Sequence, residues 1–286
     1  MRPNLAGNRG LTLVELLISV VIGLVALAAV YKVLVNQSKE FLLHRENIDV
    51  TETLRGAAAL LVSEIEHSKG SRDLVTIGAS TLKLRSFQNA GVLCVRNTAT
   101  PSPVRFGVYL NSGLFSNGTD DSAFLFRPTK GDWVRAKVTN VYSTGSLPAG
   151  TTPCGPTTAL WAGTPTPTRA VELAFPTIAT DTVGVRVGSA IRGFRMTTYS
   201  LTSSGGRWWL GRQIGSGTVD LITGPLQAGG LSFTYYDKDN NIAATAADVV
   251  SIKVTLLAES FRKVRNVGGD LDNRYDNVTL LAYLRN

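Results

Sequence analysis

The sequence lacks the residues on which most enzymes and metal proteins depend. It has two histidines and two cysteines among 286 residues. His44 and His67 lie far apart on one predicted helix, and the spacing of Cys94 and Cys154 excludes a CxxC redox or zinc motif. No GxSxG, GxxxxGK[ST] or HExxH pattern occurs. We therefore expect a protein that is not an enzyme and that carries no cofactor.

Charged side chains are missing from a long stretch near the start of the chain. None occurs from Leu16 to Tyr31. A helix over residues 11–35 would be about 37 Å long at 1.5 Å per residue, and a bilayer core is about 30 Å thick. This stretch is therefore long enough to span a membrane. Arg2 and Arg9 precede it, which predicts that the leader stays on the cytoplasmic side.

Three interpretations of this stretch are open. A cleaved signal peptide would use Ala26-Leu27-Ala28 as its cleavage site, although the apolar region is long and begins with an acid, Glu15. A plain single-span anchor is the second interpretation. It leaves Glu15 without a partner, and a carboxylate in hydrocarbon costs about 2.5–3.5 kcal/mol. The third interpretation supplies that partner.

The segment Gly10-Leu11-Thr12-Leu13-Val14-Glu15-Leu16-Leu17-Ile18 resembles the class III signal of type IV pilins and pseudopilins. The resemblance implies that a prepilin peptidase cuts after Gly10 and that the new amino terminus, Leu11, is N-methylated. It also implies that Glu15 pairs with the terminal amine of a neighbouring subunit. Two buried opposite charges are tolerable as such a pair and set an axial register. Leu11 departs from the phenylalanine most common at that place in the family.

The helix pattern continues beyond the apolar run and becomes amphipathic. Apolar residues recur on one face, and charged residues occupy much of the rest. The apolar face holds Leu43, Val50, Leu54, Ala57, Ala58, Leu61 and Ile65, and the charged set is Glu46, Asp49, Glu52, Arg55 and Glu64. Residues Lys69-Gly70-Ser71 predict the end of the helix. The expected organisation is a leader (1–10), an apolar half of the helix (11–35), an amphipathic half (36–70) and a β-rich body (71–286).

Alternating apolar and polar residues predict strands throughout the body. The expected strands cover 81–87, 92–96, 105–110, 123–126, 133–138, 191–201, 207–213, 231–236, 249–259 and 277–284. Ser203-Ser204-Gly205-Gly206 predicts a hairpin turn. Residues 145–168 hold five of the eleven prolines and predict a loop. The fold class is therefore α+β and pilin-like, with one long N-terminal helix packed on an antiparallel β-sheet body.

Two features of the body are candidate sites. An exported body meets an oxidising compartment, so we expect a disulfide between Cys94 and Cys154; the alternative is two separate buried thiols. Asp237, Asp239 and Asn241 place oxygen ligands at alternate positions, as the start of a calcium loop does. Asp and Asn clusters are also typical of turns, and Ile242 stands where an EF-hand needs glycine. The plain turn is the favoured interpretation, and calcium is the alternative.

The C-terminal residues 278–286, together with the large body, resemble the PilW type of minor pilin. This resemblance implies a structural subunit that helps to initiate a type IV pilus, within or near a tip complex. Its implied partners are other minor and major pilins, the prepilin peptidase and the inner membrane. The body would lie in the periplasm first and at the pilus surface after assembly.

The alternatives are a J-type minor pseudopilin of type II secretion and a DNA-capture or adhesion pilin. The net charge of +8 permits attraction to nucleic acid but does not demonstrate it.

Overall fold

The computed structural model describes residues 12–97, 104–112, 122–143, 169–265 and 270–285. The helices are α1 (Leu13–His67), α2 (Gly70–Asp73) and α3 (Ile178–Asp181). The strands are β1 (Leu74–Ile77), β2 (Thr81–Asn97), β3 (Val104–Ser112), β4 (Ser122–Arg127), β5 (Asp132–Ser143), β6 (Arg169–Ala174), β7 (Ala190–Ser204), β8 (Arg207–Ile214), β9 (Val219–Tyr236), β10 (Ser251–Glu259), β11 (Val264–Arg265), β12 (Leu271–Asp272) and β13 (Tyr275–Tyr283). The chain forms two compact units, residues 1–50 with 260–274, and residues 51–259 with 275–286.

The first unit joins the start of α1 to a small ribbon of β11 and β12. These two strands are antiparallel and pair Val264 with Asp272. Glu46 on α1 is only 3% exposed, and its Oε2 accepts a hydrogen bond from the Arg262 backbone N–H at 3.0 Å. The sequence placed Glu46 on the charged face of the helix. That placement was wrong because residues 260–274 return to this part of α1, far along the chain.

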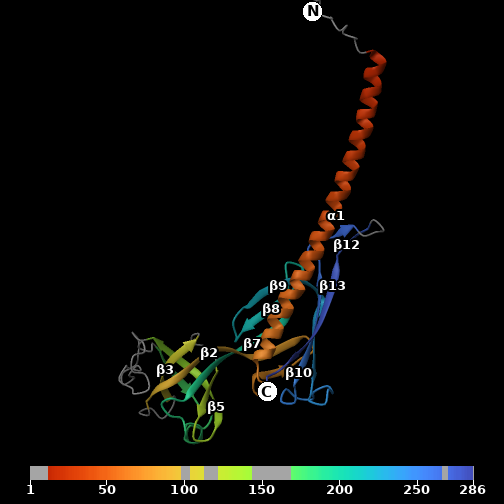
Figure 1. Ribbon diagram of the computed structural model, residues 1–286. Coiled ribbons are helices and arrows are strands. Elements are labelled where there is room, and N and C mark those ends of the chain that lie inside the picture. The colour runs from red at the N-terminus through yellow and green to blue at the C-terminus, as the bar shows by residue number, and fades with distance from the viewer. Residues whose placement is uncertain (1–11, 98–103, 113–121, 144–168, 266–269, 286) are drawn as a thin grey trace, which may run out of the picture. The chain divides into compact units, whose positions relative to one another are not determined.

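In the second unit, the end of α1 packs on an open antiparallel sheet with the strand order β1-β2-β7-β8-β9-β10-β13 (Figure 1). Thr53 Oγ1 on the helix donates to the Gly224 carbonyl of β9 at 3.5 Å, and Glu64 Oε2 accepts from Ser86 Oγ of β2 at 2.7 Å. The helix residues buried here, all from the predicted apolar face, are Leu54, Ala57, Ala58, Leu61 and Ile65. The α+β fold class is confirmed, since a long N-terminal helix precedes an antiparallel sheet body.

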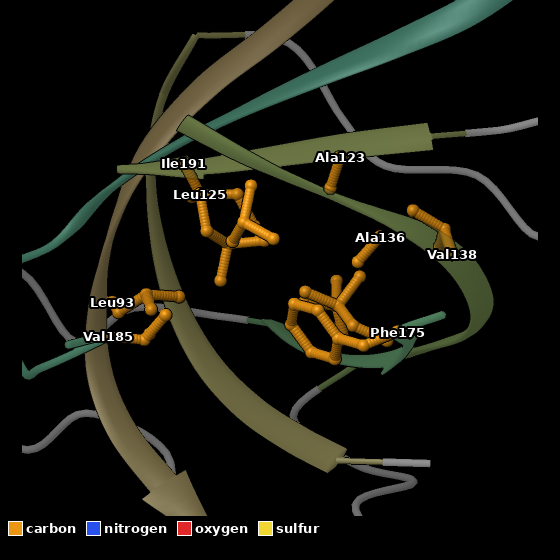
Figure 2. Packing of buried hydrophobic residues seen from close by; sticks show 11 residues of the cluster. Leu93, Ala123, Leu125, Ala136, Val138, Phe175, Val185 and Ile191 are labelled. Atoms are coloured by element: carbon orange, nitrogen blue, oxygen red, sulfur yellow. The ribbon is translucent and has the colours of Figure 1, made fainter. Parts of the chain in front are cut away.

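The same unit contains a closed antiparallel barrel in the order β2-β3-β6-β5-β4-β7. It closes because β7 pairs with both β4 and β2, through Leu125↔Ile191 and Gly91↔Ile191. Apolar side chains from these strands and from the segment between β6 and β7 fill its interior (Figure 2). They are Leu93, Ala123, Leu125, Val134, Ala136, Val138, Val171, Leu173, Phe175, Val185 and Ile191. The barrel therefore has a core that does not include α1.

Strands β2 and β7 belong to both structures. Thr81 to Phe87 of β2 pair with Ser200 to Phe194 of β7 in the open sheet, and both strands then continue into the barrel. The sequence predicted two strands, 81–87 and 92–96, where the structure has the single strand β2. The register shift between Phe87 and Asn89 interrupts the alternation and explains the gap in the prediction. Residues 88–193 thus form an insertion between two strands of the sheet.

The predicted hairpin at residues 203–206 is confirmed. β7 and β8 end on the pair Ser204↔Arg207, which leaves Gly205 and Gly206 as the two-residue turn. Both glycines have positive φ, 60° and 74°. A type I′ turn requires this backbone at both central positions, and its twist matches that of the flanking strands.

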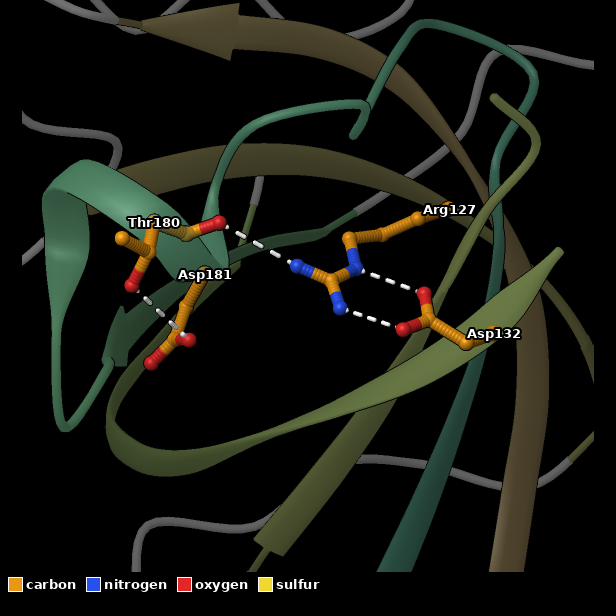
Figure 3. Close-up of polar contacts among 4 residues, drawn as sticks. All are labelled: Arg127, Asp132, Thr180 and Asp181. Atoms are coloured by element: carbon orange, nitrogen blue, oxygen red, sulfur yellow. Dashed lines mark hydrogen bonds and ion pairs between the residues drawn. The ribbon is translucent and has the colours of Figure 1, made fainter. Parts of the chain in front are cut away.

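The arginine that ends β4 holds the β4–β5 hairpin to the segment before β7 (Figure 3). Arg127 Nε donates to Asp132 Oδ1 at 2.7 Å, and Nη2 donates to Oδ2 at 2.5 Å. Arg127 Nη1 also donates to the Thr180 carbonyl of α3 at 3.1 Å. This paired geometry lowers the pKa of Asp132, chiefly through the hydrogen bonds from the guanidinium.

Candidate functional site

The first part of α1 is a helix with an apolar surface on every side. The large apolar side chains from Leu13 to Leu34 are each at least 51% exposed. Isolated exposed apolar residues are normal, but a continuous exposed surface of this kind indicates a membrane or protein partner. Among the described residues, α1 is the one helix long and apolar enough to cross a membrane. With 55 residues it is about 82 Å long at the standard rise.

Glu15 lies in the first turn of this helix and closes a capping box with Thr12. Thr12 stands immediately before the helix, and its Oγ1 accepts a hydrogen bond from the Glu15 N–H at 3.2 Å. In return, Glu15 Oε2 accepts from the Thr12 N–H at 3.0 Å and from Thr12 Oγ1 at 3.1 Å. Reciprocal bonds of this kind satisfy two of the backbone donors that a helix start leaves open. The helix dipole also favours a negative charge at this end.

The second carboxylate oxygen of Glu15 is available for another donor. Both hydrogen bonds from Thr12 end on Oε2. Among the described residues, none donates a hydrogen bond to Oε1. An ionised carboxylate can accept at both oxygens. The arrangement can therefore hold a further cationic donor, such as an amine, without first breaking the capping box.

The signal for this capping box is present in the sequence, although hydrophobicity does not reveal it. Thr12-Leu13-Val14-Glu15 is a T-x-x-E pattern directly before an apolar run, which is typical of a helix N-terminus. Hydrophobicity alone predicted that the helix starts at Leu11. The structure begins α1 at Leu13, with Thr12 as its cap.

The structure places only some of the predicted site residues. The predicted cleavage and methylation positions, Gly10 and Leu11, lie outside the described residues. Cys94 belongs to β2, but Cys154 lies outside the described residues, as does the whole of the loop predicted over 145–168. The disulfide therefore stays a prediction.

The calcium candidate is a compact turn after β9. Asp237 Oδ1 accepts hydrogen bonds from the Asp239 N–H at 2.9 Å and the Asn241 N–H at 2.8 Å. Asn240 takes a positive φ of 64°, which asparagine tolerates better than most residues. In the part of the chain that the structure describes, no group of three or more His, Cys, Asp or Glu residues is arranged to hold a metal ion. Asp237 thus serves the backbone of the turn, as Asp does in Asx turns.

Comparison with known proteins adds one finding, and it falls on the same segment. Residues 5–31 match the family model described as the prokaryotic N-terminal methylation motif. No curated protein and no solved structure matches the chain. The matched residues contain Thr12, Glu15 and the charge-free stretch that opens α1. The chain thus carries a prepilin-type N-terminal signal at the start of an apolar helix, which supports a type IV pilin-like protein.

Proposed function

We propose that this chain is a minor pilin of a type IV pilus, a structural subunit that works in pilus assembly and initiation. The methylation motif at residues 5–31, at the start of the exposed apolar helix, is the observation that carries this proposal. A prepilin peptidase would cut between Gly10 and Leu11, and Leu11 would then be N-methylated. The helix would anchor the subunit in the inner membrane with its body in the periplasm, and would enter the filament core on assembly.

Glu15 would join neighbouring subunits through the amine of Leu11. Its Oε1 is the oxygen that the capping box leaves unused, so the amine of a neighbour can bind there while Thr12 keeps Oε2. A charge-assisted hydrogen bond between an ammonium and a carboxylate is roughly twice as strong as a neutral one. In an apolar surrounding, a displaced amine would find no alternative partner nearby, and this fixes the axial register.

The amino terminus of the native protein tests the cut site. Intact-mass and peptide mass spectrometry of protein from its own membrane should find a chain that begins at methylated Leu11. The variant Gly10→Ala should keep the leader, since a small change at the cleaved bond blocks the peptidase. A native chain that retains Met1, or one that begins well beyond Leu11, would exclude this processing.

Variants of the capping box separate helix capping from subunit pairing. Glu15→Gln keeps the capping pattern, because Gln serves at this position as Glu does, but removes the charge. Thr12→Ala breaks the box and keeps the carboxylate. We expect Glu15→Gln to reduce incorporation into sheared pili at least tenfold, and Thr12→Ala to change it little, with both variants present in the membrane at wild-type levels. The reverse order would show that Glu15 acts only as a helix cap.

A further inference from the structure

A cleft of about 510 Å³ lies in the second unit, where the open sheet meets the barrel. Its volume falls within the range of roughly 300–1,000 Å³ that is usual for ligand sites. Its lining residues come from the end of α1, from α2, from strands of the sheet and the barrel, and from the C-terminal residues. None of its lining residues belongs to the apolar start of α1. The proposed assembly function therefore does not account for it.

Positive charge dominates the rim of this cleft. Lys69, Arg72, Arg192 and Arg285 line it and are exposed, whereas Asp73 is the sole acidic residue among the described residues that line it. Asp73 is 4% exposed, and its Oδ2 accepts the Lys69 backbone N–H at 2.8 Å. Its carboxylate is therefore held by the backbone beneath the rim. The four cations are exposed and outnumber Asp73, so an anion that binds in the cleft meets a net excess of positive charge.

A further arginine lies directly behind this rim. Arg85 Nη1 donates to the Arg72 carbonyl, while Arg85 Nε is buried and has no hydrogen-bond partner among the described residues. Burial lowers the pKa of Arg85, the nearby positive charge of Arg135 lowers it further, and the negative charge of Asp73 opposes both effects.

Aromatic rings line the cleft, and they pack against one another or against Arg192. Phe194 packs edge-to-face against Phe87 and Phe124, with centroids 6.0 Å and 5.2 Å apart. The guanidinium of Arg192 lies 4.8 Å from the ring centroid of Trp133. Phe87 remains 45% exposed. These rings, Phe87 above all, therefore offer apolar contact to a bulky side chain.

From this combination we propose that the cleft binds a short acidic peptide that carries a large apolar side chain beside its carboxylates. The apolar side chain packs on Phe87 and Phe194, and the carboxylates bind the guanidinium groups of Arg72 and Arg192. Arginine forks match carboxylates with two parallel hydrogen bonds. Single-stranded nucleic acid fits less well, since it needs a groove that follows about 4–16 nucleotides, and this cleft is a single hollow of about 510 Å³.

Fluorescence anisotropy with the full-length chain in detergent micelles tests this proposal. The probe is a labelled peptide of glutamate, leucine and phenylalanine. One control peptide has lysine in place of glutamate, a second has serine in place of leucine and phenylalanine, and a third probe is labelled oligothymidylate. We expect the acidic apolar peptide to bind at least about tenfold more tightly than any of the three.

Three variants locate the site. Arg192→Glu should weaken binding of the acidic peptide at least about tenfold, and Arg192→Lys should recover part of the loss because it keeps the charge. Lys238→Glu makes the same charge change on a side chain that is 81% exposed in the turn after β9, and should leave binding within about twofold. If Arg192→Glu and Lys238→Glu weaken binding of the acidic peptide equally, the loss comes from the net charge of the protein and not from the cleft. That result would overturn the proposal.

Two other outcomes would also overturn it. One is tighter binding of oligothymidylate than of the peptide, which would assign the cleft to nucleic acid. The other is no binding of any probe by a chain whose circular dichroism is that of the folded protein. Neither outcome bears on the processing of the N-terminus. Conversely, a native chain that keeps its leader would contradict the proposed pilin function, but it would not change the result of the peptide-binding experiment.

Discussion

The barrel and the open sheet share β2 and β7, yet they are stabilised in different ways. The barrel closes on itself and fills its interior with side chains from its own strands and connections. The open sheet ends at β1 on one side and at β13 on the other, and its core includes the end of α1. Closure removes sheet edges, whereas an open sheet must manage them. The contrast indicates that the sheet needs the helix in order to fold, while the barrel does not.

Excision of the barrel is the largest change to the chain that tests this contrast. A variant in which a short turn replaces residues 89–192 would join β2 to β7 through the pair Phe87↔Phe194, already present in the sheet. We expect the helix and sheet to remain folded, with unchanged hydrogen exchange in α1 residues 51–67 and in β10. Loss of protection in those segments would mean that the barrel supports the sheet, and the contrast would not hold.

A matched pair of core substitutions should give the next largest effect. Leu61 in the helix–sheet core and Leu125 in the barrel core are both 0% exposed. Leu→Ala at either position should cost about 2–5 kcal/mol, from lost burial and the cavity left behind. Leu125→Ala should raise hydrogen exchange in β4, β5 and β6, and Leu61→Ala should raise it in β9 and β10. If both variants destabilise all these strands equally, the unit unfolds as one.

Tyr235 gives a smaller effect that is specific to the open sheet. Its hydroxyl donates to the Gly78 carbonyl at 3.1 Å and lies 3.2 Å from the Thr81 carbonyl, which ties β9 to the turn between β1 and β2. Tyr235→Phe should cost about 0.5–1.5 kcal/mol. Thermal melts or urea titrations of the two proteins at neutral pH would measure this difference.

The same residue predicts an alkaline pH dependence. Burial raises the pKa of Tyr235 to about 12, above its ordinary value of 10.0. The folded state then keeps a proton that the unfolded state releases. The stabilisation is therefore fully present below pH 10 and decreases as pH rises from 10 towards 12. The difference in stability between wild type and Tyr235→Phe should shrink over this range, and a constant difference would contradict the prediction.

The Arg127–Asp132 pair in the barrel should give the smallest effect, because Asp132 is 45% exposed and solvent screens the interaction. The guanidinium holds the pKa of Asp132 below its ordinary value of 3.8. Its stabilisation is present above pH 3.8 and decreases as pH falls through the lower folded pKa. Asp132→Asn should lower the melting temperature slightly at neutral pH and not at all in strong acid. A difference that persists in strong acid would have another cause.

The sequence predicted the local elements well and the long-range arrangement poorly. Helical periodicity identified the buried face of α1 from Leu54 to Ile65, and the two glycines after Ser204 identified the hairpin. These features depend on residues close together in the chain. The barrel closes through Gly91 and Ile191, which no periodicity links. The burial of Glu46 likewise depends on Arg262, a residue that the helix pattern alone does not reveal.

At the candidate site, the sequence identified Glu15 but missed its local partner. Glu15 directly precedes the uncharged stretch of residues 16–31, and an acid at this place predicted a partner on another subunit. The bond to Thr12 was equally readable from the T-x-x-E pattern. The cleft between sheet and barrel could not be predicted from the sequence. Arg72, Phe124, Arg192 and Arg285, which line it, come from four separate parts of the chain.

The bond between Thr12 and Glu15 has a consequence for the subunit before it has any neighbour. In a single chain, the hydrogen bonds between Thr12 and Glu15 already offset part of the free-energy cost of placing the Glu15 carboxylate in an apolar surrounding. Under the proposed function, this lowers the cost of holding the subunit in the membrane before it meets a neighbour. Under the proposed function, joining a filament then adds one donor, the amine of a neighbour, to an acceptor that the capping box already holds in place.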